Sequence, residues 1–248
     1  DVYQKRIFRE KVFDVDVQDG QLNVDFEGPD FTCAVSSFVA FPLTKAAEGE
    51  KFLKYVEGRR RFHFDNNSKR VLHRPTGDPL APTDAVRRRG YIAFPREFMR
   101  ELYYNDTPLA AELGRPLAAH AFAGEIEPVS VCLLPLEDLG KVTVTVSDLV
   151  GPGGTIPARA ISTSYLSYRL LRSNLDGTVH TIVPRVLMPI NSVNMPKGIA
   201  RRFLLTVHTP ADARPGVYKG IAKVQPEKGQ TADLPVEFTG HWGTLDPL

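Results

Sequence analysis

The sequence predicts a mainly β protein, with a partial jelly-roll-like sheet, then a helix and linker, then a two-sheet antiparallel β-sandwich. Twenty prolines and 19 glycines in 248 residues favour many short strands joined by tight turns over long helices. Apolar and polar residues alternate in several runs, as on half-buried strands. Over residues 116–248, such runs recur at regular spacing between turn-forming residues, which is typical of a sandwich.

The N-terminal block carries the clearest local pattern. Apolar residues alternate with Asp and Asn on both sides of Asp19-Gly20, a pair that favours a two-residue type I′ hairpin turn. This turn sets a register with Val17 opposite Leu22, which places all the apolar side chains on one face. Phe31–Pro42 predicts a further, more buried strand.

The opposite face of this hairpin would be acidic. In the same register, Asp14 lies opposite Asp25 and Asp16 opposite Asn23, and like charges directly opposite destabilise an antiparallel pair. A Ca²⁺ ion, which prefers oxygen ligands, would relieve that repulsion. We therefore consider Asp14, Asp16 and Asp25 as a calcium site, the alternative being screening by water or by neighbouring Lys and Arg.

Residues 46–115 predict a helix followed by a Pro- and Arg-rich linker. Thr44 is a suitable N-cap, and the basic group Arg59–Arg61 suits the negative end of the helix. Asp65–Arg89 is rich in turn formers, which indicates a linker or a long surface connection. A short helix is expected near Arg96–Leu102.

Residues 116–248 predict the β-sandwich. Its eight expected strands are separated by Gly- and Asn-containing turns and cover Leu117–Ala123, Pro128–Leu134, Lys141–Ser147, Ala160–Leu171, Val179–Met188, Arg201–Thr209, Val217–Val224 and Asp233–Gly240.

Two stretches carry a resemblance to known families. Phe13–Phe26 with Ala34–Val39 resembles the closing strands of a galactose-binding or malectin-like jelly roll, which assigns residues 1–45 to an incomplete domain of that kind. Ala123–Ile161, with its GEIEP opening, and Thr209–Gly220, TPADARPGVYKG, resemble the sandwich placed ahead of the barrel in secreted, family-123-like bacterial glycoside hydrolases.

This second resemblance implies a non-catalytic accessory region. The catalytic barrel would follow at the C-terminus, and the parent protein would be a glycoside hydrolase that is secreted, periplasmic or on the cell surface. The chain would position that barrel and could also hold polysaccharide. The alternatives are a stand-alone carbohydrate-binding module, or a structural module of an extracellular assembly that associates through open strand edges.

The residues themselves supply no catalytic group. Glu125 with Glu127 could act as the carboxylate pair of a glycoside hydrolase, but two such residues at a strand start are typical of a solvated edge. In the resembled family the acidic pair lies in the barrel. Neither a nucleophile motif nor close metal-ligand spacing of histidines occurs, so we expect no cofactor apart from the calcium considered above.

Glycan binding by a β-sandwich relies on exposed aromatic rings that stack on sugar rings. Trp242, the sole tryptophan, and the Tyr103-Tyr104 pair are the candidates. Trp242 could instead fill the junction with a following domain.

The net charge, the hydropathy pattern and the cysteines bear on possible partners, membrane spans and a disulfide. A formal net charge of +2 argues against a nucleic-acid partner, and the absence of a run of 18 apolar residues argues against a membrane span. Cys33 and Cys132 lie in apolar runs, so two buried thiols are favoured over a disulfide, which stays open.

Overall fold

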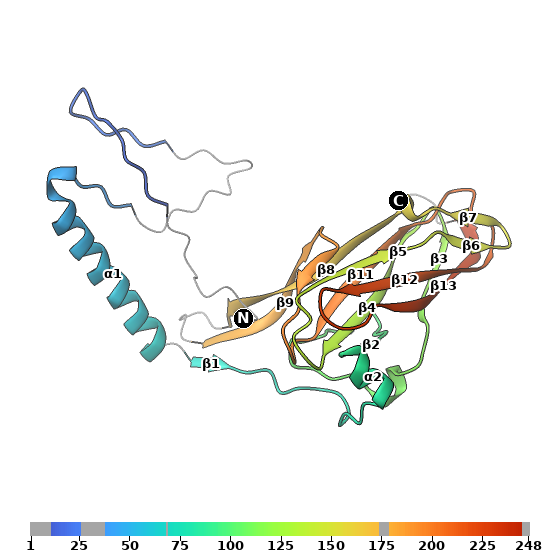
Figure 1. The fold of residues 1–248 in the computed structure, drawn as a ribbon. Coiled ribbons are helices and arrows are strands. Elements are labelled where there is room, and N and C mark those ends of the chain that lie inside the picture. Colours follow the sequence, from blue (N-terminus) through green and yellow to red (C-terminus); the bar gives the residue numbers. More distant parts are fainter. Residues whose placement is uncertain (1–10, 26–37, 68, 174–178, 245–248) are drawn as a thin grey trace. The chain divides into compact units, whose positions relative to one another are not determined.

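A computed structural model describes residues 11–25, 38–67, 69–173 and 179–244 (Figure 1). Residues from Arg70 onward form one compact unit, and the residues before it, up to Lys69, form a second. The expected domain bounds, 1–45, 46–115 and 116–248, stay a prediction. No described helix is both long and apolar enough to cross a membrane.

The larger unit is built from two sheets, which confirms the mainly β class. The first sheet has the strand order β1-β9-β8-β11-β4-β2. The second has the order β10-β5-β12-β13-β3, with the small β6–β7 pair attached to β12. In chain order the strands are β1 (Lys69–Val71), β2 (Tyr91–Phe94), β3 (Leu117–Ala123), β4 (Ile126–Pro135), β5 (Lys141–Val146), β6 (Leu149–Gly151), β7 (Gly154–Ile156), β8 (Ile161–Arg172), β9 (Val179–Met188), β10 (Ser192–Asn194), β11 (Arg201–His208), β12 (Gly216–Pro226) and β13 (Ala232–Thr244).

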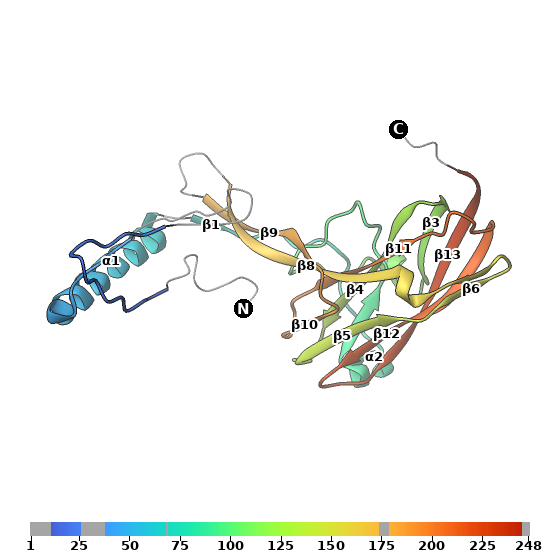
Figure 2. The same ribbon diagram turned by 90° about the horizontal axis from the view of Figure 1, so that it is seen from above.

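The expected antiparallel sandwich is present, with one parallel pair at an edge. β3 pairs with β13 in parallel, with Val236 opposite Leu117 and Gly240 opposite Ala121. The reason lies in the connectivity, because β3 turns at Gly124 into β4 of the other sheet and so joins the last strand without a hairpin. The other registered pairs are antiparallel, and β8 with β9 forms a long ladder that extends from the sandwich (Figure 2).

The core between the sheets is apolar. Val131 and Phe203 from the first sheet and Val144 and Phe238 from the second are fully buried in it. β4 is buried over Val129–Leu134 because both of its faces are covered, which explains why this run is apolar at every position except Ser130.

The second face of β4 is covered by the segment that precedes the sandwich. Ile92 and Phe94 of β2 pack with Leu102, Cys132 and Leu134 in a small second core. The segment expected to be linker thus includes the short helix α2 (Asp84–Arg89) and strand β2, both in the larger unit. No helix forms at Arg96–Leu102, where the chain turns and Leu102 points into this core.

The eight expected strands are all present. Five of them differ from expectation by one or two residues at an end, and β13 continues four residues further, to Thr244. The boundaries of β3 and β9 agree fully with expectation. Cys132 is a free, buried thiol, and Cys33 lies outside the described residues.

The smaller unit contains helix α1 (Ala46–Asn67), preceded by the 3-10 turn η2 (Leu43–Lys45). Thr44 therefore lies within the turn and does not cap α1, and α1 continues past Arg59–Arg61 instead of ending there. The Glu57–Arg61 ion pair, one helical turn apart, supports this continuation.

The expected N-terminal hairpin is only partly formed. The bend lies where Asp19-Gly20 predicts it, with Gly20 at a φ of 78° and Asp19 accepting a hydrogen bond from the N–H of Gln21. No strand is present over residues 11–25, and Phe13 remains 75% exposed. An isolated two-stranded hairpin has little to stabilise it when its apolar face is uncovered. Phe26 and most of Phe31–Pro42 lie outside the described residues.

Candidate functional site

A surface hollow of about 300 Å³ lies beside Trp242, near the end of β13. The indole of Trp242 is 85% exposed, an unusual state for so large an apolar side chain. We call this hollow the Trp242 surface; it is lined by Ala123, Ala211, Asp212, Ala213, Pro215, His241, Trp242 and Gly243.

The turn between β11 and β12 builds one wall of the Trp242 surface. The N–H of Thr209 donates to Glu125 O at 2.9 Å, and the N–H of Ala213 donates to Pro210 O at 3.0 Å. The Tyr218 hydroxyl donates to Arg214 O at 2.6 Å and so fixes the far end of the turn. The turn that contributes four residues to the hollow is thus held by one internal bond and by bonds to the β3–β4 turn and to β12.

The end of β13 builds the other wall. The pairing of β13 with β3 is irregular between Gly240 and Thr244, and Gly243 has a φ of 113°, which L side chains rarely adopt. This irregularity marks the place where Trp242 stands out into solvent.

Polar groups flank the indole. His241 Nε2 lies 3.3 Å from His120 Nδ1, and their rings stack with centroids 5.4 Å apart. Phe122 packs on His241 at 5.8 Å between ring centroids, while Asp212 lines the opposite wall. An exposed ring beside a carboxylate and imidazoles can stack on a sugar and hydrogen-bond its hydroxyl groups.

The structure does not bring Tyr103 and Tyr104 to this surface. Tyr103 stacks on His73 with ring centroids 3.6 Å apart, and its hydroxyl donates to Glu101 at 2.6 Å, which, with burial, raises its pKa to about 12. Tyr104 meets Tyr168 edge-on at 6.1 Å. The Tyr104 carbonyl accepts from Ala200 N, just before β11, whereas the hollow follows β11, so roughly 25 Å of strand separates the two places. The tyrosines remain a separate prediction.

A buried ionic network, which the sequence analysis missed, lies beneath residues 72–113. Arg96 has no exposed side-chain area and binds both Glu112 oxygens at 2.9 Å, through Nε and Nη2. Its Nη2 also donates to Thr107 O at 2.9 Å, and its Nη1 lies 3.4 Å from Asp106 Oδ2. All three guanidinium nitrogens therefore bond to groups of this chain.

Asp106 is the second centre of this network. Its Oδ1 accepts from Thr76 N at 2.8 Å and contacts His73 Nε2 at 3.1 Å, while its Oδ2 accepts from Tyr103 N at 2.8 Å. Burial by itself would raise the pKa of Asp106, but these hydrogen bonds outweigh it and hold the pKa below its ordinary value. The carboxylates of Asp106 and Glu112 are thus both committed to bonds within this segment, which they hold together.

Arg201 and Arg202 are two further buried cations at the start of β11. Arg202 donates to the carbonyls of Glu97, Phe98 and Arg100 and so fixes that turn. Arg201 lies over the rings of Tyr165 and Tyr168, at 5.8 and 5.4 Å from their centroids. Burial lowers the pKa of Arg201.

The acidic candidates take ordinary positions. Glu125 Oε2 accepts from Phe122 N at 2.6 Å in the turn between β3 and β4. Asp14, Asp16 and Asp25 are exposed, and the strand pair that would place them opposite one another is not formed. Within the described residues no three His, Cys, Asp or Glu side chains are grouped so as to hold a metal ion, and the calcium site stays a prediction.

The comparisons with known proteins give distant structural similarities. No family model and no curated protein matches the sequence. A family 123 glycoside hydrolase from Clostridium perfringens is similar over 50% of this chain and 22% of that chain, with 21% identity and a TM-score of 0.45. The PapD-like domain 7 of human CEP192 is 10% identical over 69% of this chain and 99% of that domain, with a TM-score of 0.30. CfaE, the adhesive subunit of the CFA/I fimbria of Escherichia coli, is 16% identical over 54% of this chain and 47% of its own, with a TM-score of 0.28. Likenesses of this degree do not assign a family.

Proposed function

We propose that this chain is a non-catalytic accessory region that binds polysaccharide through the Trp242 surface and positions a catalytic domain of the same polypeptide. The observation that carries the proposal is the 85% exposed indole beside a hollow with polar walls. An exposed tryptophan leaves apolar surface in contact with water in the free protein, which is unfavourable. Stacking on a ligand removes that surface from water.

The sequence resemblance supports the same surface. The motif Thr209–Gly220 contains Ala211, Asp212, Ala213 and Pro215, which all line the hollow. If the resemblance to family-123-like glycoside hydrolases holds, the chemistry of the partner is a glycan, the catalytic groups belong to a barrel, and the protein is exported.

The buried charged side chains bond to groups of the chain itself, which supports the proposal that this region is non-catalytic. Arg96, Asp106 and Glu112 bond to one another and to neighbouring backbone and side-chain groups within the described residues. A catalytic carboxylate needs a face open to substrate, whereas Asp106 has 1% of its side chain exposed.

A second candidate role rests on the same indole. Trp242 could pack against a neighbouring domain, since an exposed apolar side chain at a strand end is also typical of a domain interface. The chain would then position its neighbour without holding polysaccharide itself.

Affinity electrophoresis against a panel of soluble neutral and acidic polysaccharides tests the proposal. Wild type should be retarded by at least one polysaccharide, and Trp242→Ala should lose at least tenfold in affinity, which corresponds to about 1.4 kcal/mol. Trp242→Phe, which keeps a ring, should lose less. Lys219→Ala, at an exposed ion pair on β12, is the matched control and should bind as wild type does.

Two results would contradict the proposal. One is retardation that Trp242→Ala leaves unchanged. The other is a full panel without retardation, which would leave the domain-interface role as the better account of the exposed indole.

A further inference from the structure

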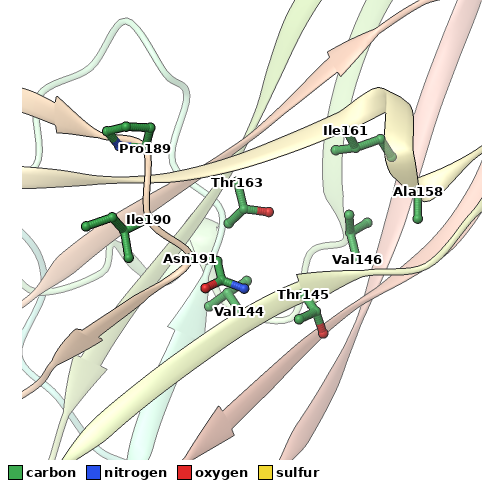
Figure 3. Close-up of a pocket in the computed structure, with 9 residues that line it drawn as sticks. All are labelled: Val144, Thr145, Val146, Ala158, Ile161, Thr163, Pro189, Ile190 and Asn191. Atoms are coloured by element: carbon green, nitrogen blue, oxygen red, sulfur yellow. The ribbon is translucent and has the colours of Figure 1, made fainter.

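An open seam lies between the two sheets on the side where the chain crosses from β9 to β10 (Figure 3). The hollow there measures about 490 Å³. Figure 3 shows Ile161 and Thr163 of β8 facing Val144 and Val146 of β5 across it, with Pro189–Asn191 closing one end. This hollow lies apart from the Trp242 surface, because the two share no lining residue.

The β8 side of the seam is an unpaired strand edge. β9 pairs with β8 only as far as Met188 opposite Tyr165, and Pro189, which has no N–H, then takes the chain away toward β10. On its other side β8 pairs with β11 down to Ile161. Among the described strands, none pairs with residues 161–164 on the side that β9 has left.

The direction of the β8 backbone groups follows from the ladder. The N–H of Thr209 donates to Glu125 O, on the side of β11 that faces β4. Successive residues of a strand point their backbone N–H and C=O to alternate sides, so Leu204 and Thr206 point theirs toward β8. Their partners Ser164 and Ser162 therefore point toward β11. Thr163, between them, directs its N–H and C=O into the seam.

The β5 side is open in the same way. The N–H of Val144 donates to Asn191 O at 2.9 Å, on the side of β10. Val146, two residues further, directs its N–H and C=O to the same side, where the register of β10 with β5 has already ended at Thr143. Two unpaired edges thus face one hollow.

The lining determines what could fill the hollow. None of its nine residues is charged, and a buried charge without a partner is strongly unfavourable. Six of the nine are apolar, among them Ile190, which is 47% exposed. Unpaired strand edges bind extended backbone, and a lining of apolar, Thr and Asn residues without a charge selects uncharged side chains at alternate positions.

We propose that this seam binds an extended, uncharged β-strand of a partner polypeptide, which adds to the edge of β8 in the position that β9 vacates. The backbone groups of Thr163 make the ladder bonds, and alternate apolar side chains of the partner occupy the hollow. This interaction goes beyond the glycan-binding role, and neither depends on the other.

Amide hydrogen exchange on the full chain tests the proposal directly. The probe is a capped peptide of alternating Thr and Val with a Lys at each end for solubility. Its control is the same peptide N-methylated along one edge, which cannot form ladder hydrogen bonds. The Thr163 and Val146 amides should exchange quickly in the free protein, and the plain peptide should slow exchange at Thr163 at least tenfold, whereas the methylated peptide should not.

Three variants separate backbone binding from side-chain effects. Thr163→Pro removes the N–H that faces the seam but no bond to β11, and it should abolish peptide binding, whereas the near-isosteric Thr163→Val should bind within threefold of wild type. If Thr163→Pro does not fold, Ile190→Lys replaces it, because a charge at the exposed rim should weaken peptide binding at least tenfold without touching the ladder.

The proposal is overturned if both peptides slow exchange equally, if Thr163→Val loses binding, or if the plain peptide at millimolar concentration leaves exchange unchanged. It is also overturned if the Thr163 amide is already protected in the free protein because the chain self-associates through this edge, which sedimentation would reveal.

Discussion

Arg96 shows how single residues hold the pre-sandwich segment in place. Its side chain is fully buried, yet every hydrogen bond that it makes goes to residues between Asp106 and Glu112, within the same segment. Because Phe94 of β2 packs beneath the guanidinium at 5.4 Å, the network also rests on the first sheet.

Removal of Arg96 should therefore be costly. We expect Arg96→Ala to lower the free energy of unfolding by about 3–5 kcal/mol, since it leaves two buried carboxylates without their partner. Urea unfolding followed by circular dichroism measures this. Lys219→Ala, which breaks an exposed pair with Glu237, should change it by no more than about 0.5 kcal/mol. An Arg96→Ala effect as small as the control's would contradict the network's role.

Asp106 should make the stability depend on acid pH. Its pKa in the folded protein lies below the ordinary value of 3.8, so the stabilisation from its charged form is complete above about pH 4 and is lost as the pH falls through the lowered pKa. Asp106→Asn should thus be much less stable than wild type at pH 7, and the gap should narrow toward pH 2.

Unfolding free energies at several pH values between 2 and 7 check this. Asp233→Asn, at an exposed pair with Lys223, is the control and should keep a small, constant gap to wild type. A gap for Asp106→Asn that stays constant or widens in acid would contradict the assignment.

At the scale of elements, the short helix α2 depends on its two ends. The Thr83 hydroxyl accepts from Val86 N at 3.4 Å, and Gly90 ends the helix in the left-handed region with a φ of 89°. Gly90 leads directly into β2, so the conformation at this one residue sets the path of the chain into the first sheet.

We expect Gly90→Ala to destabilise the larger unit by about 1–2 kcal/mol, the usual cost of a left-handed conformation for an L residue. Its Cβ would also approach the Glu137 carboxylate. Thermal unfolding measures the loss, and Gly90→Asn, which tolerates this region better, should recover part of it. An Ala variant as stable as wild type would show that the turn can relax.

The elements also show what the sequence alone reveals. The sandwich strands could be predicted because alternation and turn residues are local signals, as in β9, where Asn174–Gly177 and Pro189 flank a run rich in β-branched residues. β2 could not, since four residues in an Arg-rich stretch become a strand only through pairing with β4. The predicted strands of the N-terminal hairpin are absent for the converse reason, because their strong local pattern has no packing partner among the described residues.

The candidate site, too, could be predicted from the sequence only in part. Trp242 stands out in the sequence as the sole tryptophan, but its hollow could not be predicted, because the β11–β12 turn meets β13 only through long-range pairing. Arg201 and Arg202 begin an expected strand, but their burial could not be predicted, because tyrosines and carbonyl groups from distant segments cover them.

At the scale of the whole molecule, the sandwich uses its two ends and its side for different purposes. The end near Ala200 is occupied by the packed segment with Tyr104, whereas the end after β11 presents the Trp242 surface. The side between β5 and β8 leaves strand edges open. Contacts with other molecules can therefore take place at two separate surfaces of one rigid scaffold.

The most direct measurement of the central claim is the fluorescence of Trp242, which reports on this one surface because the chain has no other tryptophan. Acrylamide should quench the free protein strongly, as an 85% exposed indole requires, and a bound polysaccharide should shift the emission to shorter wavelength and protect it from quenching. Emission and quenching that stay unchanged with a polysaccharide the protein demonstrably binds would place the binding site elsewhere and contradict the account.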